Sequence, residues 1–221
     1  MKKVKLVSGL VLSAFILLLS AYGCDPEDIK KNPTIGGDTD YAENQVGSIS
    51  KLYVSGDDSQ AQLKVTDNQG GVITVEATFT IPAEYRTTIE NLGETFYGSK
   101  TKFIDSQGKF KSSFKVKNSS EGIAFYDPKD RQVVAMKYDT KVGEKWSFDK
   151  ANGEKIDFKV THKSDTDDFQ YSFFNIKVVK VEQIFHEPGI TKIVYIGNHK
   201  FGLVGIEFYL EDGTIIRTSR I

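Results

Sequence analysis

Cysteine is almost absent from this chain of 221 residues, because Cys24 is the only one. A single thiol cannot form a disulfide within the chain or a paired-cysteine zinc site. The stability of the folded part must therefore come from buried apolar side chains. The 15 Phe and 10 Tyr residues supply a large apolar area for that purpose.

Charge of one sign is not in excess either, since 29 basic residues face 30 acidic ones. Proteins that bind nucleic acid carry a basic surplus on at least one face or segment. We therefore expect no nucleic acid among the partners of this chain.

Motifs that usually accompany catalysis are also missing. The sequence has no Gly-x-Ser-x-Gly and no glycine-rich phosphate loop, which argues against nucleophilic and nucleotide chemistry. His162, His186 and His199 lack the spacing of a metal site, and the acids of 165–168 lack the glycine of a calcium loop. We predict a protein that is not an enzyme and holds no cofactor or metal, although a hydrolase with two carboxylates distant in sequence stays open.

A long apolar run occurs once, between Leu6 and Tyr22, directly after three lysines near the start of the chain. It is short for a membrane span of roughly 20 residues, and serines interrupt it. A basic start, an apolar stretch and a small residue at the exit, here Gly23, are typical of a secretory signal peptide. We predict that residues 1–23 are such a signal.

The end of this segment, Ala21-Tyr22-Gly23-Cys24, resembles the lipobox of bacterial lipoproteins, although Ala21 stands where Leu is usual. In that class the cysteine is diacylated, released by signal peptidase II and often acylated again. The resemblance implies acyl chains on Cys24 and a membrane as partner, and two or more chains anchor a protein durably. It also implies a place in the cell envelope, most simply the outer membrane. An unmodified secretory signal and an uncleaved membrane helix remain as alternatives.

Residues 24–47 are rich in proline, glycine and charge, and predict a flexible acidic tether. The acids directly after Cys24 have three interpretations. They resemble an export signal for the cell surface in some lipoproteins, Asp25 resembles a signal for retention at the inner membrane in others, and a solvated linker needs neither.

From residue 48 onward, apolar and polar residues alternate with a period of two, which indicates half-buried antiparallel strands. The clearest runs are 72–81, 109–117 and 156–160. Asn-Gly and Asp-Gly pairs between the runs are typical of hairpins. The expected strands are 48–55, 60–67, 72–81, 101–105, 109–117, 121–126, 131–139, 145–149, 154–162, 170–185, 191–198, 201–210 and 214–221.

These runs predict one all-β, mainly antiparallel domain over residues 48–221, either a curved sheet forming a half-open β-barrel or a two-layer sandwich. Segment 82–92 is the one expected short helix, and adjacent Val178 and Val179 predict a bulge or bend in strand 170–185. A Gly-x-x-Trp at 143–146 and Gly-Leu-Val at 202–204 resemble a pattern in TapB-like bacterial envelope proteins over residues 130–210, which implies the half-open barrel and little about chemistry.

Aromatic side chains are the best candidates for a binding site. Strand alternation places Tyr171 and Phe173 on one face, and one of two apolar faces can line a cavity or partner surface in place of the core. The predicted ligand-binding residues are Tyr171, Phe173, Tyr195, Phe201 and Trp146.

These observations favour a lipid-anchored envelope protein whose β domain binds a hydrophobic ligand or an outer-membrane protein. A glycan-binding module at the cell surface is the alternative, in which exposed tyrosines or Trp146 stack on sugar rings. That alternative requires Trp146 to be accessible to solvent.

Overall fold

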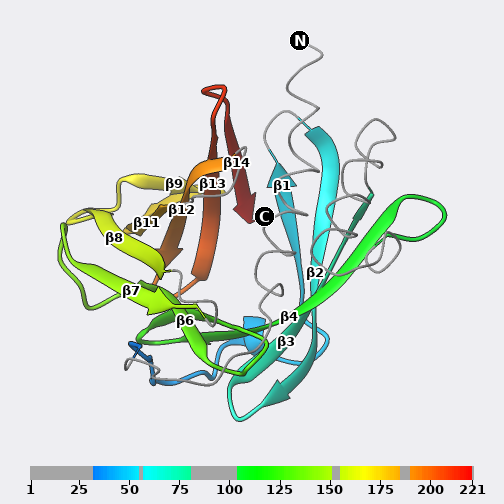
Figure 1. Cartoon of the computed structure of the whole chain (residues 1–221), viewed down its shortest axis with the longest axis horizontal. Helices are drawn as coiled ribbons and strands as arrows, with labels where there is room; N and C mark the ends of the chain where they lie inside the picture. Colours follow the sequence, from blue (N-terminus) through cyan, green and yellow to red (C-terminus); the bar gives the residue numbers. More distant parts are fainter. Residues whose placement is uncertain (1–31, 55–56, 81–103, 151–154, 185–189, 221) are drawn as a thin grey trace.

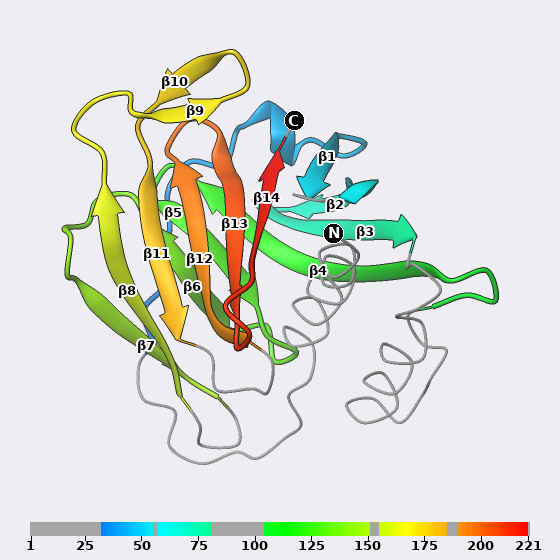
Figure 2. The same cartoon turned by 90° about the horizontal axis from the view of Figure 1, so that it is seen from above.

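The computed structural model describes residues 32–54, 57–80, 104–150, 155–184 and 190–220. Within these ranges the chain forms a 12-stranded antiparallel sheet that curls into a nearly closed barrel (Figures 1 and 2). Of the two architectures expected from the sequence, the half-open barrel is confirmed and the two-layer sandwich is wrong.

The strands follow the predicted alternation closely. Those of the large sheet are β1 (Ile49–Val54), β2 (Asp57–Gln69), β3 (Val72–Thr80), β4 (Lys109–Ser119), β5 (Gly122–Tyr126), β6 (Gln132–Lys137), β7 (Lys145–Asp149), β8 (Lys155–Lys163), β11 (Val179–Ile184), β12 (Ile190–Asn198), β13 (Gly202–Leu210) and β14 (Ile215–Arg220). A separate hairpin consists of β9 (Phe169–Tyr171) and β10 (Phe174–Ile176), and η1 (Ala42–Asn44) is a short 3-10 helix.

The order of the large sheet is β6-β5-β4-β3-β2-β1-β14-β13-β12-β11-β8-β7. Most neighbours are consecutive in sequence and joined by hairpins. The pairing of β1 with β14 brings the two ends of the domain together, and it leaves β6 and β7 as the two ends of the sheet. Both views place these two strands next to each other.

Burial follows the period of two. In β3, Ile73, Val75, Ala77 and Phe79 are all buried, whereas the threonines between them are partly exposed. The inward side chains of the other strands join them in one continuous core inside the barrel.

Side chains hold β6 against β7, where the sheet order ends. The Trp146 indole Nε1 donates a hydrogen bond of 2.6 Å to the Val134 carbonyl, and Arg131 Nη1 donates one of 3.3 Å to the Asp149 carbonyl. These bonds replace a backbone ladder along the seam between β6 and β7.

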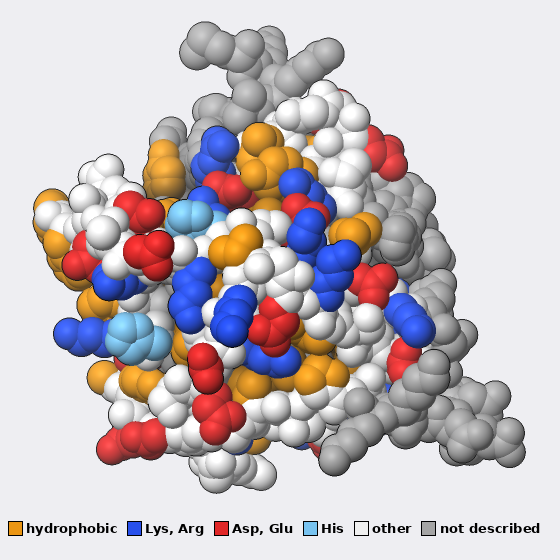
Figure 3. All heavy atoms as spheres, turned by 90° about the vertical axis from the view of Figure 1, so that its left-hand side faces the viewer, with side chains coloured by type: hydrophobic (Ala, Val, Ile, Leu, Met, Phe, Trp, Pro, Cys, Tyr) orange, Lys and Arg blue, Asp and Glu red, His pale blue; other side chains and the backbone are white. Residues whose placement is uncertain are grey.

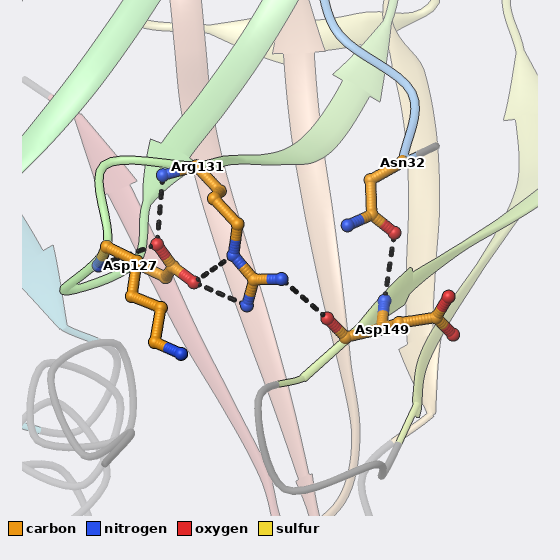
Figure 4. A network of polar contacts seen from close by, with 5 residues as sticks. Asn32, Asp127, Arg131 and Asp149 are labelled. Atoms are coloured by element: carbon orange, nitrogen blue, oxygen red, sulfur yellow. Dashed lines mark hydrogen bonds and ion pairs between the residues drawn. The ribbon is translucent and has the colours of Figure 1, made fainter. Parts of the chain in front are cut away.

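Arg131 is itself held by Asp127 in the β5–β6 turn (Figure 4). Its Nε and Nη2 lie 2.8 and 2.7 Å from Asp127 Oδ2, while Asp127 Oδ1 accepts the backbone N–H groups of Lys129 and Arg131. The Asp127 side chain is 2% exposed. The guanidinium also lies over the Phe148 ring of β7, 4.7 Å from its centroid, so the ion pair and the ring packing act on the same seam.

The segment before β1 packs on the barrel from its first described residue, inside the range expected to be a tether. Ile35 is buried in the core, and its N–H donates to Gln132 Oε1 at 2.8 Å. Asn32 Oδ1 accepts the Asp149 N–H at 3.0 Å (Figure 4). The buried Ile35 side chain and these two hydrogen bonds hold the segment on the barrel, although its composition alone predicts disorder.

Two other expectations change. The long strand expected over 170–185 is divided into β9, β10 and β11, because Ser172 takes a left-handed backbone (φ 54°) and turns the chain between β9 and β10. The expected break at Val178 and Val179 lies at the start of β11. Of strand 101–105, Ile104 makes an isolated bridge to Phe110, and the expected helix 82–92 lies outside the described residues.

The seam predicts a strong effect for Asp127→Asn. The amide keeps an acceptor for the two backbone N–H groups but leaves the largely buried Arg131 guanidinium without its counter-charge, so we expect the free energy of unfolding to fall by about 2–3 kcal/mol. Asp130→Asn is the matched control in the same turn, because its ion pair with Lys115 is exposed, and should cost under about 1 kcal/mol. Urea unfolding measures both, and equal losses would contradict the role of the buried pair.

Residues 32–47 are predicted to be part of the folded unit. Ile35→Ala should lower the free energy of unfolding by about 2–4 kcal/mol, because it opens a cavity in the core. Ile49→Ala, at a side chain that is 54% exposed, should change it by about 0.5 kcal/mol or less. Chemical denaturation measures the free energy of unfolding of both variants. An unchanged midpoint for Ile35→Ala would show that this segment contributes nothing to stability.

Candidate functional site

Two of the five aromatic residues predicted to bind ligand lie in the core of the barrel. Trp146 is 8% exposed and stacks on Phe158, with ring centroids 5.8 Å apart. Tyr195 is 1% exposed, and its hydroxyl donates to Gln183 Oε1 at 2.6 Å. Because the indole is buried and bonded across the seam, it offers no face on which a sugar ring could stack.

The other three lie on the outside of the barrel, at the β9–β10 hairpin and the start of β13. Tyr171 and Phe201 are in contact, with centroids 5.3 Å apart. Phe173 points fully into solvent from the hairpin turn, so the turn at Ser172 separates it from the face on which strand alternation placed it. The five residues therefore do not form one site.

A cavity that the sequence analysis missed lies inside the barrel. It measures about 130 Å³ and opens between the strands β1–β5 and the last two strands, β13 and β14. Its apolar wall consists of Leu52, Leu63, Val65, Ile73, Val75, Phe114, Val116, Ile123, Phe125, Leu203 and Ile206. Four of these side chains, Leu52, Leu63, Phe114 and Leu203, are only partly buried against the core.

Alternation in the strands builds this wall. Leu63 and Val65 project inward from β2, as Phe114 and Val116 do from β4. The Phe114 ring meets Phe125, with centroids 6.2 Å apart, and thereby continues the packed core behind the cavity. The inner end of the wall is thus part of the packed core.

Small side chains explain why the space is not filled. Ser48 and Ser50 of the β1 region and Thr218 of β14 line the cavity where the neighbouring strands place large apolar groups. Ser50 pairs across the sheet with Leu63. The sequence contains one sign of the cavity, which is the pair of serines at inward positions, Ser48 and Ser50, where the neighbouring strands have apolar residues.

Polar groups gather at one end of the cavity, where η1 lies beside the end of β14 (Figure 2). Arg220 Nη2 is 3.5 Å from Glu43 Oε1, with the two side chains 20% and 28% exposed. Arg220 Nη1 also donates to the Phe201 carbonyl at 3.2 Å. This end can therefore receive a polar or charged group, while the rest of the lining is mostly apolar.

Asparagines fix η1 across this end. Asn44 is buried, and its Nδ2 donates to the carbonyls of Thr39 and Asn118 at 2.8 and 2.9 Å. The Asn118 side chain in turn donates to Asn44 Oδ1 at 3.3 Å. The position of Glu43 beside the cavity thus depends on a bonded amide pair.

A second cluster combines His162, Ser164 and Asp168 on the outside of the barrel. Ser164 Oγ donates to Asp168 Oδ1 at 2.5 Å and accepts the Val178 N–H at 3.0 Å. His162 Nε2 lies 3.2 Å from Ser164 Oγ and 3.6 Å from Asp168 Oδ2. The hydrogen bond from Ser164, followed by the charge of His162, lowers the pKa of Asp168.

This arrangement differs from a nucleophilic triad. There the carboxylate holds the ring nitrogen that faces away from the serine, whereas here the same Nε2 meets both partners and the serine proton is directed to the carboxylate. The cluster is better explained as a clamp, since it fixes the loop before β9 to the backbone at Val178.

The remaining candidates show no constellation. His199 is exposed in the β12–β13 turn, while His186 lies outside the described residues. Within the described ranges, no group of three or more His, Cys, Asp or Glu side chains is placed to hold a metal ion. The described part of the chain also contains no helix with the length and apolar character needed to cross a membrane.

Neither a protein-family model nor a curated protein matches the chain. Two solved structures are similar to it. One is a "putative exported protein with YmcC-like fold" from Bacteroides fragilis NCTC 9343, at 11% identity and TM-score 0.42, covering 80% of this chain and 95% of that one. The other is a "putative lipoprotein" from Parabacteroides distasonis ATCC 8503, at 12% identity and TM-score 0.35, covering 80% and 94%. Likeness at this level leaves the site to be argued from its own residues.

Proposed function

We propose that this chain is a lipid-anchored protein of the cell envelope whose barrel binds a hydrophobic ligand without chemically changing it. The observation that carries the proposal is the cavity with its apolar wall and its single polar end. Such a concave apolar site with a few convergent polar groups is the usual form of a small-molecule site.

The size of the cavity limits what enters. An apolar cavity of about 150 Å³ holds a molecule the size of benzene, so a cavity of about 130 Å³ takes one ring or a short hydrocarbon segment. Removing about 100 Å² of ligand surface from water contributes about 2.5 kcal/mol. The ligand is therefore an amphiphile whose apolar end enters and whose polar end stays outside.

The polar end of the cavity favours an anionic or hydroxylated head group. Arg220 offers guanidinium N–H groups there, and Asn118 lines the same end. The Glu43 carboxylate already lies 3.5 Å from the Arg220 guanidinium. It therefore repels a second negative charge at this end of the cavity. A carboxylate must therefore compete with Glu43 for the guanidinium, whereas an alcohol need not.

The envelope part of the proposal rests on the leader. A basic, apolar and small-residue sequence ends at Cys24, and acylation there would hold the barrel at a membrane. We place the protein at the outer membrane, where a barrel with an internal apolar cavity has amphiphiles within reach.

Ser50→Leu is expected to abolish ligand binding without harming the fold. The added side chain fills the cavity, so the affinity for hexanoate and hexanol should fall at least about tenfold, while the free energy of unfolding stays equal or rises. Saturation-transfer NMR with these two probes measures binding. Lys51→Leu is the matched control, because Lys51 is exposed on the next position of the same strand. Unchanged binding in Ser50→Leu would refute the cavity as the site.

Cys24→Ala is expected to release the protein from membranes. Wild-type protein should incorporate an alkyne-labelled fatty acid and sediment with membranes, and the variant should do neither. Protease treatment of intact cells then tells which side of the envelope the barrel faces. Labelling of the Cys24→Ala variant would contradict lipidation at this residue.

A further inference from the structure

The two charges at the polar end of the cavity come from separate parts of the fold. Glu43 belongs to η1 and Arg220 ends β14, and both side chains line the cavity. Their closest atoms, Glu43 Oε1 and Arg220 Nη2, are 3.5 Å apart, whereas a short charge-assisted hydrogen bond measures about 2.7–2.9 Å. This charge pair, Glu43 with Arg220, therefore places an acceptor and a donor side by side where a head group can meet both.

The other polar side chains of this end have partners within the protein. The hydroxyls of Thr218 and Ser48 donate to backbone carbonyls at 3.3 and 2.7 Å. The side chains of Asn44 and Asn118 are bonded to each other at 3.3 Å. The charge pair is therefore the group at this end that is best placed to select a ligand.

The backbone on both sides of the charge pair is held by long-range contacts. The Asn68 side chain of β2 donates to the Asn44 carbonyl at 2.9 Å, which ties η1 to the barrel wall. Arg220 pairs with Leu52 of β1, and its Nη1 donates to the Phe201 carbonyl at 3.2 Å. The fold, and not a ligand, therefore brings the two charges together.

The protein as a whole gives little preference for ligands of one charge sign. The chain has 29 basic and 30 acidic residues. On the face drawn in Figure 3, Lys and Arg side chains lie among Asp and Glu side chains. Because long-range attraction of a charged ligand needs a surplus of the opposite sign, we expect selection of the head group to arise locally, at the charge pair.

We propose that the charge pair selects neutral amphiphiles whose head group both donates and accepts hydrogen bonds, such as an alcohol or a primary amide. This inference rests on the proposed function and narrows its ligand class. A hydroxyl donates to Glu43 and accepts from Arg220. A carboxylate only accepts and is repelled by Glu43, whereas an ammonium only donates and is repelled by Arg220. The charge pair thus excludes head groups of either sign, while the apolar wall holds the tail.

The experiment compares hexanol, hexanoate and hexylammonium on the full chain at neutral pH, by competition in saturation-transfer NMR. Wild-type protein should bind hexanol at least about tenfold more tightly than either ion. Glu43→Gln removes the negative charge but keeps a hydrogen-bonding group, so the affinity for hexanoate should rise about tenfold while that for hexanol changes less than about twofold. Arg220→Gln should raise the affinity for hexylammonium instead.

Asp40→Asn is the matched control for Glu43→Gln. It removes the same charge from the same segment, at an exposed side chain that is not among those lining the cavity. An exposed charge is screened by water and salt, so all three affinities should stay within about twofold of wild type. Urea unfolding shows whether each variant is folded, and Glu43→Gln decides alone if Arg220→Gln is not.

Equal hexanoate affinities in Glu43→Gln and Asp40→Asn would overturn the inference. Wild-type protein that binds hexanoate or hexylammonium as tightly as hexanol would overturn it as well. Both results leave the cavity as a binding site, which Ser50→Leu tests separately. If none of the three probes binds wild-type protein, the proposed function fails and this inference fails with it.

Discussion

The barrel depends on how its two sheet ends are held together. A 12-stranded antiparallel sheet that ended freely at β6 and β7 would expose two rows of unpaired backbone groups, which invite pairing with other chains. The Trp146 indole and the Arg131 guanidinium cover carbonyls at both ends instead. Because Asp127 neutralises and orients Arg131, a single buried carboxylate connects the β5–β6 turn to the seam.

That closure also separates two kinds of interior. On the side of the seam aromatic side chains fill the interior, with Trp146 stacked on Phe158 and Phe148 beneath the Arg131 guanidinium. On the opposite side, where β1 meets β14, serines replace large inward residues and leave the cavity. Backbone pairing between β1 and β14, at Leu52 to Val54 and Thr218 to Arg220, joins the two strands beside this gap.

The outer surface shows why aromatic content alone locates no site. The sequence contains enough aromatic residues for a core and a binding surface, and residue type does not distinguish them. Tyr195 lies on β12 and Phe201 in the turn that follows this strand, yet one is in the barrel and the other outside it. Phe173 was expected on the face of Tyr171, and the left-handed Ser172 placed it in a turn. Short-range turn geometry of this kind is poorly encoded, because Ser adopts it only when the hairpin demands it.

By itself the sequence determined the all-β class, the antiparallel pairing and most strand limits, because alternation of side chains is a local property of a strand. It also determined that the inward faces of β3, β4 and β8 are apolar. Only the tertiary structure decided that the sheet curls into a barrel, that Trp146 seals it, that residues 32–47 pack on it and that a cavity lies beside Ser50. Each of these depends on contacts between residues far apart in the chain, for which one sequence contains no local pattern.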